Sequence, residues 1–128
     1  MSTGSELLLA GCVAAGGALG APARYLLDKA VSSRVRTSFP LGTFAINVAG
    51  SLLLGLLTGL ALRGALPAES TAFVATGFCG AFTTFSTWTF ETVELFEQGA
   101  YLQAGLNVLG SLAAGLLAAA AGIALGLL

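Results

Sequence analysis

The chain has 128 residues, of which 56% are hydrophobic and only 9% are charged, and its mean hydropathy is +0.93. These values lie outside the range of soluble domains and within that of proteins that cross a membrane several times. The formal net charge of −1 gives no basic field for nucleic acid, and the sequence contains no histidine, the usual metal ligand and proton carrier. We therefore expect a single membrane domain that is not an enzyme.

Four charge-free apolar stretches follow one another along the chain, at residues 7–23, 39–62, 70–90 and 99–128. Each approaches or exceeds the ~20 residues that an α-helix needs to cross the hydrocarbon core of a bilayer. They predict one domain over residues 1–128 with four transmembrane helices, at about 5–27, 39–62, 70–98 and 100–128. An even number of spans places both termini on the same side of the membrane.

The first predicted helix lacks the basic residues that precede the apolar core of a signal peptide, since Glu6 is the only charge ahead of that core. We therefore expect it to be retained as a membrane helix. Pro22 is expected to bend or end this helix. The charged segment 24–38 then forms an interfacial stretch that leads to Pro40, at the start of the second helix.

Polar residues follow one face of the second helix, because Thr43, Asn47 and Ser51 are four residues apart. Asn107 and Ser111 repeat this spacing on the fourth helix. An unpaired amide at membrane depth costs several kcal/mol, so the Asn47 side chain must face a partner helix or a polar path. The sequence leaves these two roles, a bond between helices and a contact with an ion, equally open.

The third predicted helix combines glycines, hydroxyls and aromatic rings between residues 77 and 88. The glycines at 77 and 80 loosen a helix, and a straight helix over 70–98 would reach ~43 Å, well beyond a ~30 Å core. We therefore expect a break near residues 77–83. Backbone carbonyls freed at membrane depth survive only where they meet protein, water or an ion. The motif indicates an ion or substrate path, and packing between helices through Ser and Thr is the alternative.

Two aromatic residues just after the predicted break, Phe85 and Trp88, project from similar sides of the helix because they are three residues apart. Ring edges carry positive potential, so two rings presented edge-on can hold a small anion without a formal cation, and simple aromatic packing is the alternative. A proton-coupled exporter needs a carboxylate at mid-membrane, but the candidates Glu6 and Glu91 fall near the ends of spans. These residues favour an anion over a proton as the permeant species.

Small residues recur four apart in three of the predicted helices. They are Gly16 and Gly20; Ser51, Gly55 and Gly59; and Ser111 and Gly115 with Gly122 and Gly126. In lipid this spacing lets helix backbones approach closely, so we interpret these residues as packing surfaces. Four helices of this size enclose almost no lumen. A path through the membrane therefore requires a second chain.

Four motifs, one in each predicted helix and in the same order, resemble those of the CrcB/Fluc fluoride channel family. They are GALGAPARY at 17–25, GTFAINVAGS at 42–51, GFCGAFTTFST at 77–87 and NVLGS at 107–111. The resemblance covers the whole chain, and the third motif is the most specific. It implies an all-α membrane protein with four transmembrane helices and a broken third helix, assembled as an antiparallel, dual-topology homodimer. It further implies a fluoride-selective ion channel that lowers cytoplasmic fluoride by passive export across the inner membrane.

The resemblance also implies roles for individual residues. The pore and fluoride-binding positions are Asn47, Phe85, Trp88, Ser111, Thr87 and Ser86. Arg24 matches a vestibule arginine, and the backbone carbonyls of Gly80 and Thr83 would hold a structural Na⁺, not transported, at the dimer centre. The family has a second phenylalanine where this chain has Trp88. The tryptophan keeps an aromatic edge but adds bulk and an N–H donor.

Three alternatives stay open at this stage. Basic residues are unevenly distributed, since Arg24, Lys29, Arg34 and Arg36 share one side against Arg63 on the other. Dual-topology proteins usually show almost no such bias, so a heterodimer with an oppositely oriented partner is the alternative to the homodimer. A small multidrug-type exporter would need the mid-helix carboxylate that this sequence lacks. In a non-transporting membrane assembly factor, the polar residues would only hold helices together.

Overall fold

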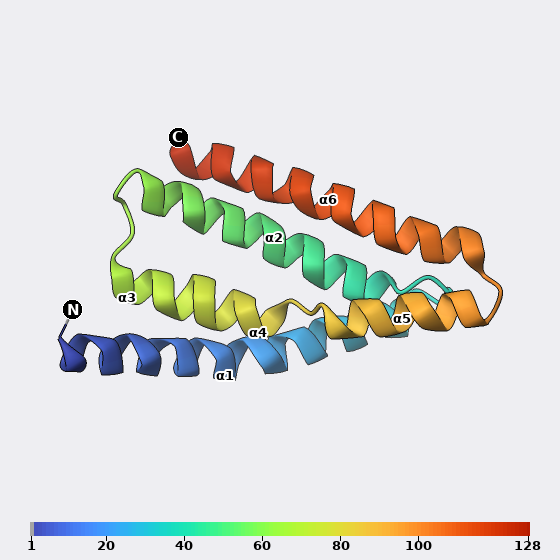
Figure 1. The fold of residues 1–128 in the computed structure, drawn as a ribbon, viewed down its shortest axis with the longest axis horizontal. Helices are drawn as coiled ribbons and strands as arrows, with labels where there is room; N and C mark the ends of the chain where they lie inside the picture. The colour runs from blue at the N-terminus through green and yellow to red at the C-terminus, as the bar shows by residue number, and fades with distance from the viewer. Residues whose placement is uncertain (1) are drawn as a thin grey trace.

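The computed structural model describes residues 2–128, and apart from its turns this part of the chain is helical (Figure 1). Three helices are long and apolar enough to cross a membrane: α1 (Thr3–Arg34), α2 (Leu41–Leu62) and α6 (Tyr101–Leu127). Shorter helical segments lie between α2 and α6, namely α3 (Ala68–Ser70), the π-helix η1 (Thr71–Cys79), α4 (Gly80–Phe82) and α5 (Ser86–Glu97). The structure confirms the prediction of an all-α, multi-pass membrane protein.

The helices lie side by side and the chain passes four times along the bundle (Figure 1). Both termini lie at one end of the bundle, and the turn between α5 and α6 lies at the other. α2 packs along α6, while α1 packs against η1 and α4. α5 packs mainly against α6. The passes that carry the predicted pore residues, α2, α5 and α6, are therefore neighbours.

Helix α1 is longer than the sequence predicted. The prediction ended this helix near residue 27, but α1 continues through Pro22 to Arg34. A proline inside a helix removes one backbone hydrogen bond. The helix is packed on both sides of Pro22, since Gly16 and Gly20 lie against η1 and Asp28 lies against Gly42 of α2. Only residues 35–40 therefore connect α1 to α2, and most of the charged segment 24–38 is helical.

The third pass contains a short stretch of irregular backbone. α4 ends at Phe82, Thr83 is extended (φ −80°, ψ 161°), and α5 begins at Ser86. Figure 1 shows this stretch, residues 83–85, as the narrow link between α4 and α5, about midway along the bundle. Backbone polar groups here lack the regular bonding of a helix, so their partners decide what this region can do.

Glycines bring the backbones of neighbouring helices into close contact. A Cβ added at Gly55 would meet the backbone of α6, and one added at Gly122 would meet the backbone of α2. In the same way, Gly16 and Gly20 leave room for the backbone of η1 beside α1. These contacts confirm the packing role predicted for the small residues at these positions.

We expect Gly122→Ala to lower the free energy of unfolding by about 1–3 kcal/mol, the usual cost of overpacking. The new Cβ would lie 2.6 Å from the backbone nitrogen of Leu56, so α2 and α6 must move apart. Unfolding of the purified protein in detergent measures the change. Gly105→Ala on the same helix is the control, because no heavy atom lies within 4 Å of its Cβ position. Equal losses in the two variants would contradict the packing role of Gly122.

Candidate functional site

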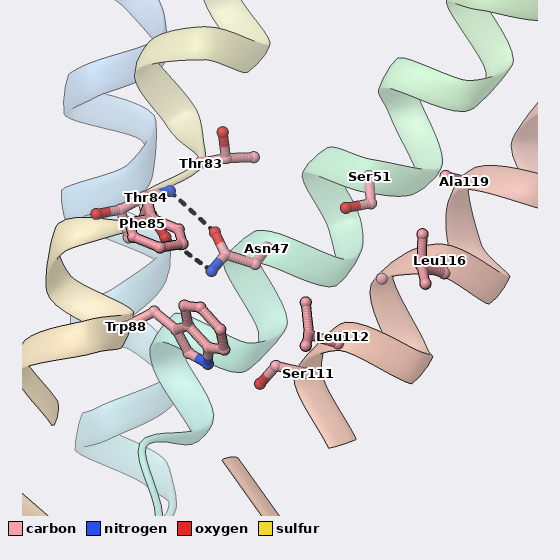
Figure 2. A pocket seen from close by; sticks show the side chains of 11 residues that line it. Asn47, Ser51, Thr83, Thr84, Phe85, Trp88, Ser111, Leu112, Leu116 and Ala119 are labelled. Carbon is pink, nitrogen blue, oxygen red and sulfur yellow. Dashed lines mark hydrogen bonds between the residues drawn. The ribbon is translucent and has the colours of Figure 1, made fainter. Parts of the chain in front are cut away.

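A cavity of about 370 Å³ lies beside the irregular residues 83–85 and collects polar and aromatic side chains from three passes (Figure 2). It is lined by Asn47, Ser51, Thr83, Thr84, Phe85, Trp88, Ser111, Leu112, Gly115, Leu116 and Ala119. None of these lining residues carries a formal charge. The cavity therefore offers hydroxyls, an amide and ring edges within an apolar wall.

The side-chain amide of Asn47 pairs with the backbone of Thr84 in both directions. Its Nδ2 donates to the Thr84 carbonyl oxygen at 2.9 Å, and its Oδ1 accepts from the Thr84 N–H at 2.9 Å (Figure 2). These two hydrogen bonds give partners to the backbone N–H and carbonyl of Thr84, which lies between α4 and α5. A primary amide has two N–H donors, so one donor of Asn47 is left for another contact. Asn47 thus holds the irregular backbone and still lines the cavity.

The same hydrogen bonds deprive two backbone carbonyls of their helical partners. In a continuous α-helix, the N–H groups of Thr84 and Thr87 would donate to the carbonyls of Gly80 and Thr83. Here the Thr84 N–H donates to Asn47, and the Thr87 N–H donates to Thr84 Oγ1 at 3.2 Å. Gly80 is also exposed, with no heavy atom within 4 Å of its Cβ position. The two carbonyls for which the family resemblance implies a sodium site therefore lack the donors that a regular helix would give them.

The two aromatic side chains of the cavity contact each other edge to face. The ring centroids of Phe85 and Trp88 are 5.3 Å apart, and the planes are inclined by 62°. Phe85 is 74% exposed in the single chain, whereas Trp88 is half-buried and its indole Nε1–H donates to the Asn107 carbonyl at 3.0 Å. Both rings lie near the Asn47 amide (Figure 2). An anion in the cavity would thus find an amide and ring edges together.

The remaining predicted residues lie in different places. A pocket of about 200 Å³ holds Arg24 and Thr87 together with Asp28, and it touches the main cavity through Thr84. Ser86 is exposed in the first turn of α5 and lines neither space. The structure thus gathers Asn47, Phe85, Trp88 and Ser111 in one cavity, with Arg24 and Thr87 in a neighbouring pocket.

Two contacts in this region could not be predicted from the sequence. The first is the backbone of Thr84, which leaves no signal in residue type because the main chain makes the contact. The second is Glu91, whose carboxylate accepts a hydrogen bond from the hydroxyl of Thr43, a side chain only 3% exposed. The four-residue polar stripe on the second helix identified Thr43 but could not reveal a partner 48 residues away in the sequence.

The usual metal-binding side chains are not clustered in the part of the chain that the structure describes. Across residues 2–128, His, Cys, Asp and Glu form no group of three or more that could hold a metal ion. Every buried side-chain nitrogen or oxygen in the same range has a hydrogen-bond partner.

Comparison with known proteins gives a match over most of the chain. The model of the family described as "CrcB-like protein, Camphor Resistance (CrcB)" matches residues 11–123. Fluoride-specific ion channel FluC 1 of Frankia casuarinae is 52% identical over 118 residues, covering 88% of this chain and 92% of the relative. FluC 1 of Streptomyces avermitilis is 50% identical, with 87% and 90% covered. Fluoride-specific ion channel FluC of Maridesulfovibrio salexigens is 44% identical, with 89% and 91% covered.

We expect Asn47→Leu to lower the free energy of unfolding by about 2 kcal/mol, since two backbone groups of Thr84 lose their partners in an apolar setting. Unfolding in detergent, followed by circular dichroism, measures the loss. The control is Ser51→Ala, one turn further along α2, which removes a hydroxyl from the same cavity but leaves the pairing of Asn47 intact. Similar stability of Asn47→Leu and wild type would show that the pairing does not hold residues 83–85.

Proposed function

The chain belongs to the CrcB-like protein family, and we propose that it is a fluoride-selective ion channel of the bacterial inner membrane. It is a multi-pass membrane protein and not an enzyme. The observation that carries the proposal is the cavity beside residues 83–85, where an amide, hydroxyls and two aromatic rings meet without a charged side chain. The names of the relatives support fluoride as the permeant ion.

The chemistry of the cavity suits an anion that must bind briefly and then leave. Conduction requires binding strong enough to replace water yet weak enough to release the ion. The free N–H of Asn47 and the ring edges of Phe85 and Trp88 supply neutral donors of this kind. A lysine or arginine in the same place would hold the anion by full charge pairing. We therefore assign the pore to Asn47, Phe85, Trp88 and Ser111, with Thr87 in the pocket of Arg24. A pore role for Ser86, which lines neither space, stays a prediction from the family resemblance.

Export through such a pore needs no coupling to an energy source. An inside-negative membrane potential favours the exit of a monovalent anion by ~2.3 kcal/mol for each 100 mV. A passive channel therefore lowers cytoplasmic fluoride wherever the ion has accumulated above its electrochemical equilibrium. The lack of a mid-span carboxylate in the sequence agrees with this passive mode.

We further propose that residues 83–85 break the third membrane helix and that the carbonyls of Gly80 and Thr83 help to hold a structural Na⁺. The diversion of the Thr84 and Thr87 N–H groups supports this assignment, because it leaves oxygen atoms available for a hard cation. The bound ion would supply positive charge near the pore, worth about 2 kcal/mol to an anion at ~8 Å with an effective dielectric near 20. That attraction is large enough to draw fluoride in and too small to trap it.

Two carbonyls of one chain do not complete the shell of a cation, so the proposed sodium site implies a second chain. We propose an antiparallel homodimer surrounded by membrane lipid, in which an inverted copy brings both irregular segments to a shared midplane. In the single chain Gly80 is exposed and Phe85 is 74% exposed, which supports a contact with a second chain on this side. The distribution of basic residues argues for a single orientation, and a heterodimer with an oppositely oriented partner would satisfy both observations.

We expect liposomes containing the purified protein to lose fluoride quickly and to retain chloride, because the cavity has only weak neutral donors for a small anion. Ion-selective electrodes measure both effluxes after a potassium ionophore allows charge to balance. Equal efflux of the two anions, or efflux of neither, would contradict the proposed function.

We expect Phe85→Ile to reduce fluoride efflux by roughly tenfold, as expected for the loss of an aromatic contact worth ~1.4 kcal/mol. The matched control is Phe90→Ile on the same helix, because Phe90 is 69% exposed and does not line the cavity. Comparable loss in both variants would indicate a general effect on α5, and no loss in Phe85→Ile would remove this ring from the pore.

We expect about half of the copies to expose residue 35 on each side of the membrane, as dual topology requires. Val35→Cys in a variant with Cys12 and Cys79 replaced by alanine gives a single thiol in the segment that joins α1 to α2. A membrane-impermeant maleimide applied to spheroplasts measures the reacting fraction. Complete labelling or none would mean one orientation, and would favour the heterodimer.

A further inference from the structure

Trp88 is the only tryptophan of the chain, and its indole adds an N–H group that must find a partner away from water. That partner is the main-chain carbonyl of Asn107 on α6, at 3.0 Å. A carbonyl oxygen has two lone pairs, so it can accept this bond in addition to a helical one. The indole is thereby fixed to α6, although Trp88 itself belongs to α5.

The side chain of Asn107 makes a second hydrogen bond between α6 and α5. It is fully buried, with 0% of its surface exposed, and its Nδ2 donates to Thr92 Oγ1 at 2.8 Å. The Thr92 hydroxyl in turn donates to the Trp88 carbonyl at 2.8 Å. Trp88, Asn107 and Thr92 are thus linked by three hydrogen bonds, two between α5 and α6 and one within α5. We call this arrangement the indole clamp.

The indole clamp also reaches the wall of the cavity through Ser111. The Ser111 hydroxyl donates to Asn107 Oδ1 at 3.3 Å, one turn further along α6. Trp88 and Ser111 both line the cavity, whereas Asn107 and Thr92 do not. Asn107, behind the wall, therefore accepts hydrogen bonds from both of these wall residues, through its main-chain carbonyl and its side-chain oxygen.

The orientation of the indole matters because an aromatic ring is not electrostatically uniform. Its edge is positive and attracts an anion, whereas its face is negative and repels one. An indole released from α6 would turn about its side-chain bonds and present its face for part of the time. The Thr92 hydroxyl accepts from the Asn107 amide and donates to the Trp88 carbonyl, so these two bonds polarise each other. They act on the indole through the backbone, because the bond between Asn107 and Thr92 keeps the α6 carbonyl beside α5.

We propose that Asn107 and Thr92 are positioning residues that hold the edge of Trp88 toward the permeating anion. The inference rests on the proposed fluoride channel function and deepens it, since it assigns a role to two residues outside the pore. This role would explain how the cavity accommodates a tryptophan at position 88, whose N–H needs a hydrogen-bond partner. The buried amide keeps the larger ring in one orientation.

The first test is Thr92→Val, which preserves the shape of the side chain and removes its hydroxyl. We expect fluoride efflux from liposomes to fall roughly fivefold, the change that the loss of one or two hydrogen bonds produces. Thr92→Ser keeps the hydroxyl and should restore efflux. The matched control is Thr89→Val, because the Thr89 hydroxyl likewise donates to the carbonyl four residues earlier, that of Phe85 at 2.9 Å, but does not bond Asn107.

The second test separates positioning from general stabilisation of the helix pair. Trp88→Phe removes the N–H that the indole clamp holds, so Thr92→Val added to Trp88→Phe should lower efflux by less than about twofold relative to Trp88→Phe alone. If the Thr92 hydroxyl only stabilised the contact between α5 and α6, its removal would lower efflux by the same factor in the wild type and in Trp88→Phe. The ratio of the two effects therefore measures the coupling between Thr92 and the indole.

The third test observes the indole directly. With one tryptophan, a ¹⁵N–¹H spectrum of the protein in detergent contains one indole signal. We expect Thr92→Val to move its proton upfield, as a weakened hydrogen bond requires, while Thr89→Val and Thr92→Ser leave it in place. Equal loss of efflux in both backgrounds, or an unmoved indole signal in Thr92→Val, would overturn the indole clamp even if the wild type conducts fluoride. Absence of fluoride efflux from the wild type would instead overturn the proposed function.

Discussion

The structure depends on one constraint, which is that backbone polar groups placed among apolar helices must find partners within the protein. Residues 83–85 leave the helical bonding pattern, and the amide of Asn47 meets the exposed N–H and carbonyl of Thr84. This pairing makes irregular backbone tolerable in the third pass. It also determines which other groups stay free, because the Thr84 N–H no longer bonds Gly80. The same two hydrogen bonds therefore stabilise the irregular segment and leave the Gly80 carbonyl without the donor that a regular helix would give it.

The pairing requires that α2 lie at a defined height and distance beside the third pass. Helix contacts through glycine supply that precision, since Gly55 and Gly59 admit the backbone of α6 and Gly50 admits the side chain of Thr83. Backbones in direct contact have little freedom to slide, because each turn fits into a gap left by a missing Cβ. Close packing at these small residues therefore brings Asn47 level with Thr84. A membrane bundle with bulkier contacts would place Asn47 less exactly against Thr84.

Features that depend on local sequence could be predicted, and those that depend on distant partners could not. Apolar length identified the membrane helices, and four-residue glycine spacing identified their contacts, because both signals lie within one helix. The end of α1 was misplaced, since Pro22 and the charges after it resemble a helix boundary, although the helix continues to Arg34 and packs there against α2 through Asp28 and Gly42. The need of the Asn47 amide for a partner was clear, but its partner is main chain and has no signature. The link from Trp88 through Asn107 to Thr92 joins side chains on two helices, and only the fold brings them together.

The circuit around Asn107 has a consequence for how this sequence could have evolved. A phenylalanine at position 88 needs no hydrogen-bond partner, so it is compatible with many residues at positions 92 and 107. A tryptophan needs a buried acceptor, and the main-chain carbonyl at position 107 supplies one whatever side chain stands there. The side chains at positions 92 and 107 depend on each other instead, because the Asn107 amide donates to the Thr92 hydroxyl and a change at one position leaves the other without its partner. A paired substitution at these two positions is therefore more easily accepted than either change alone.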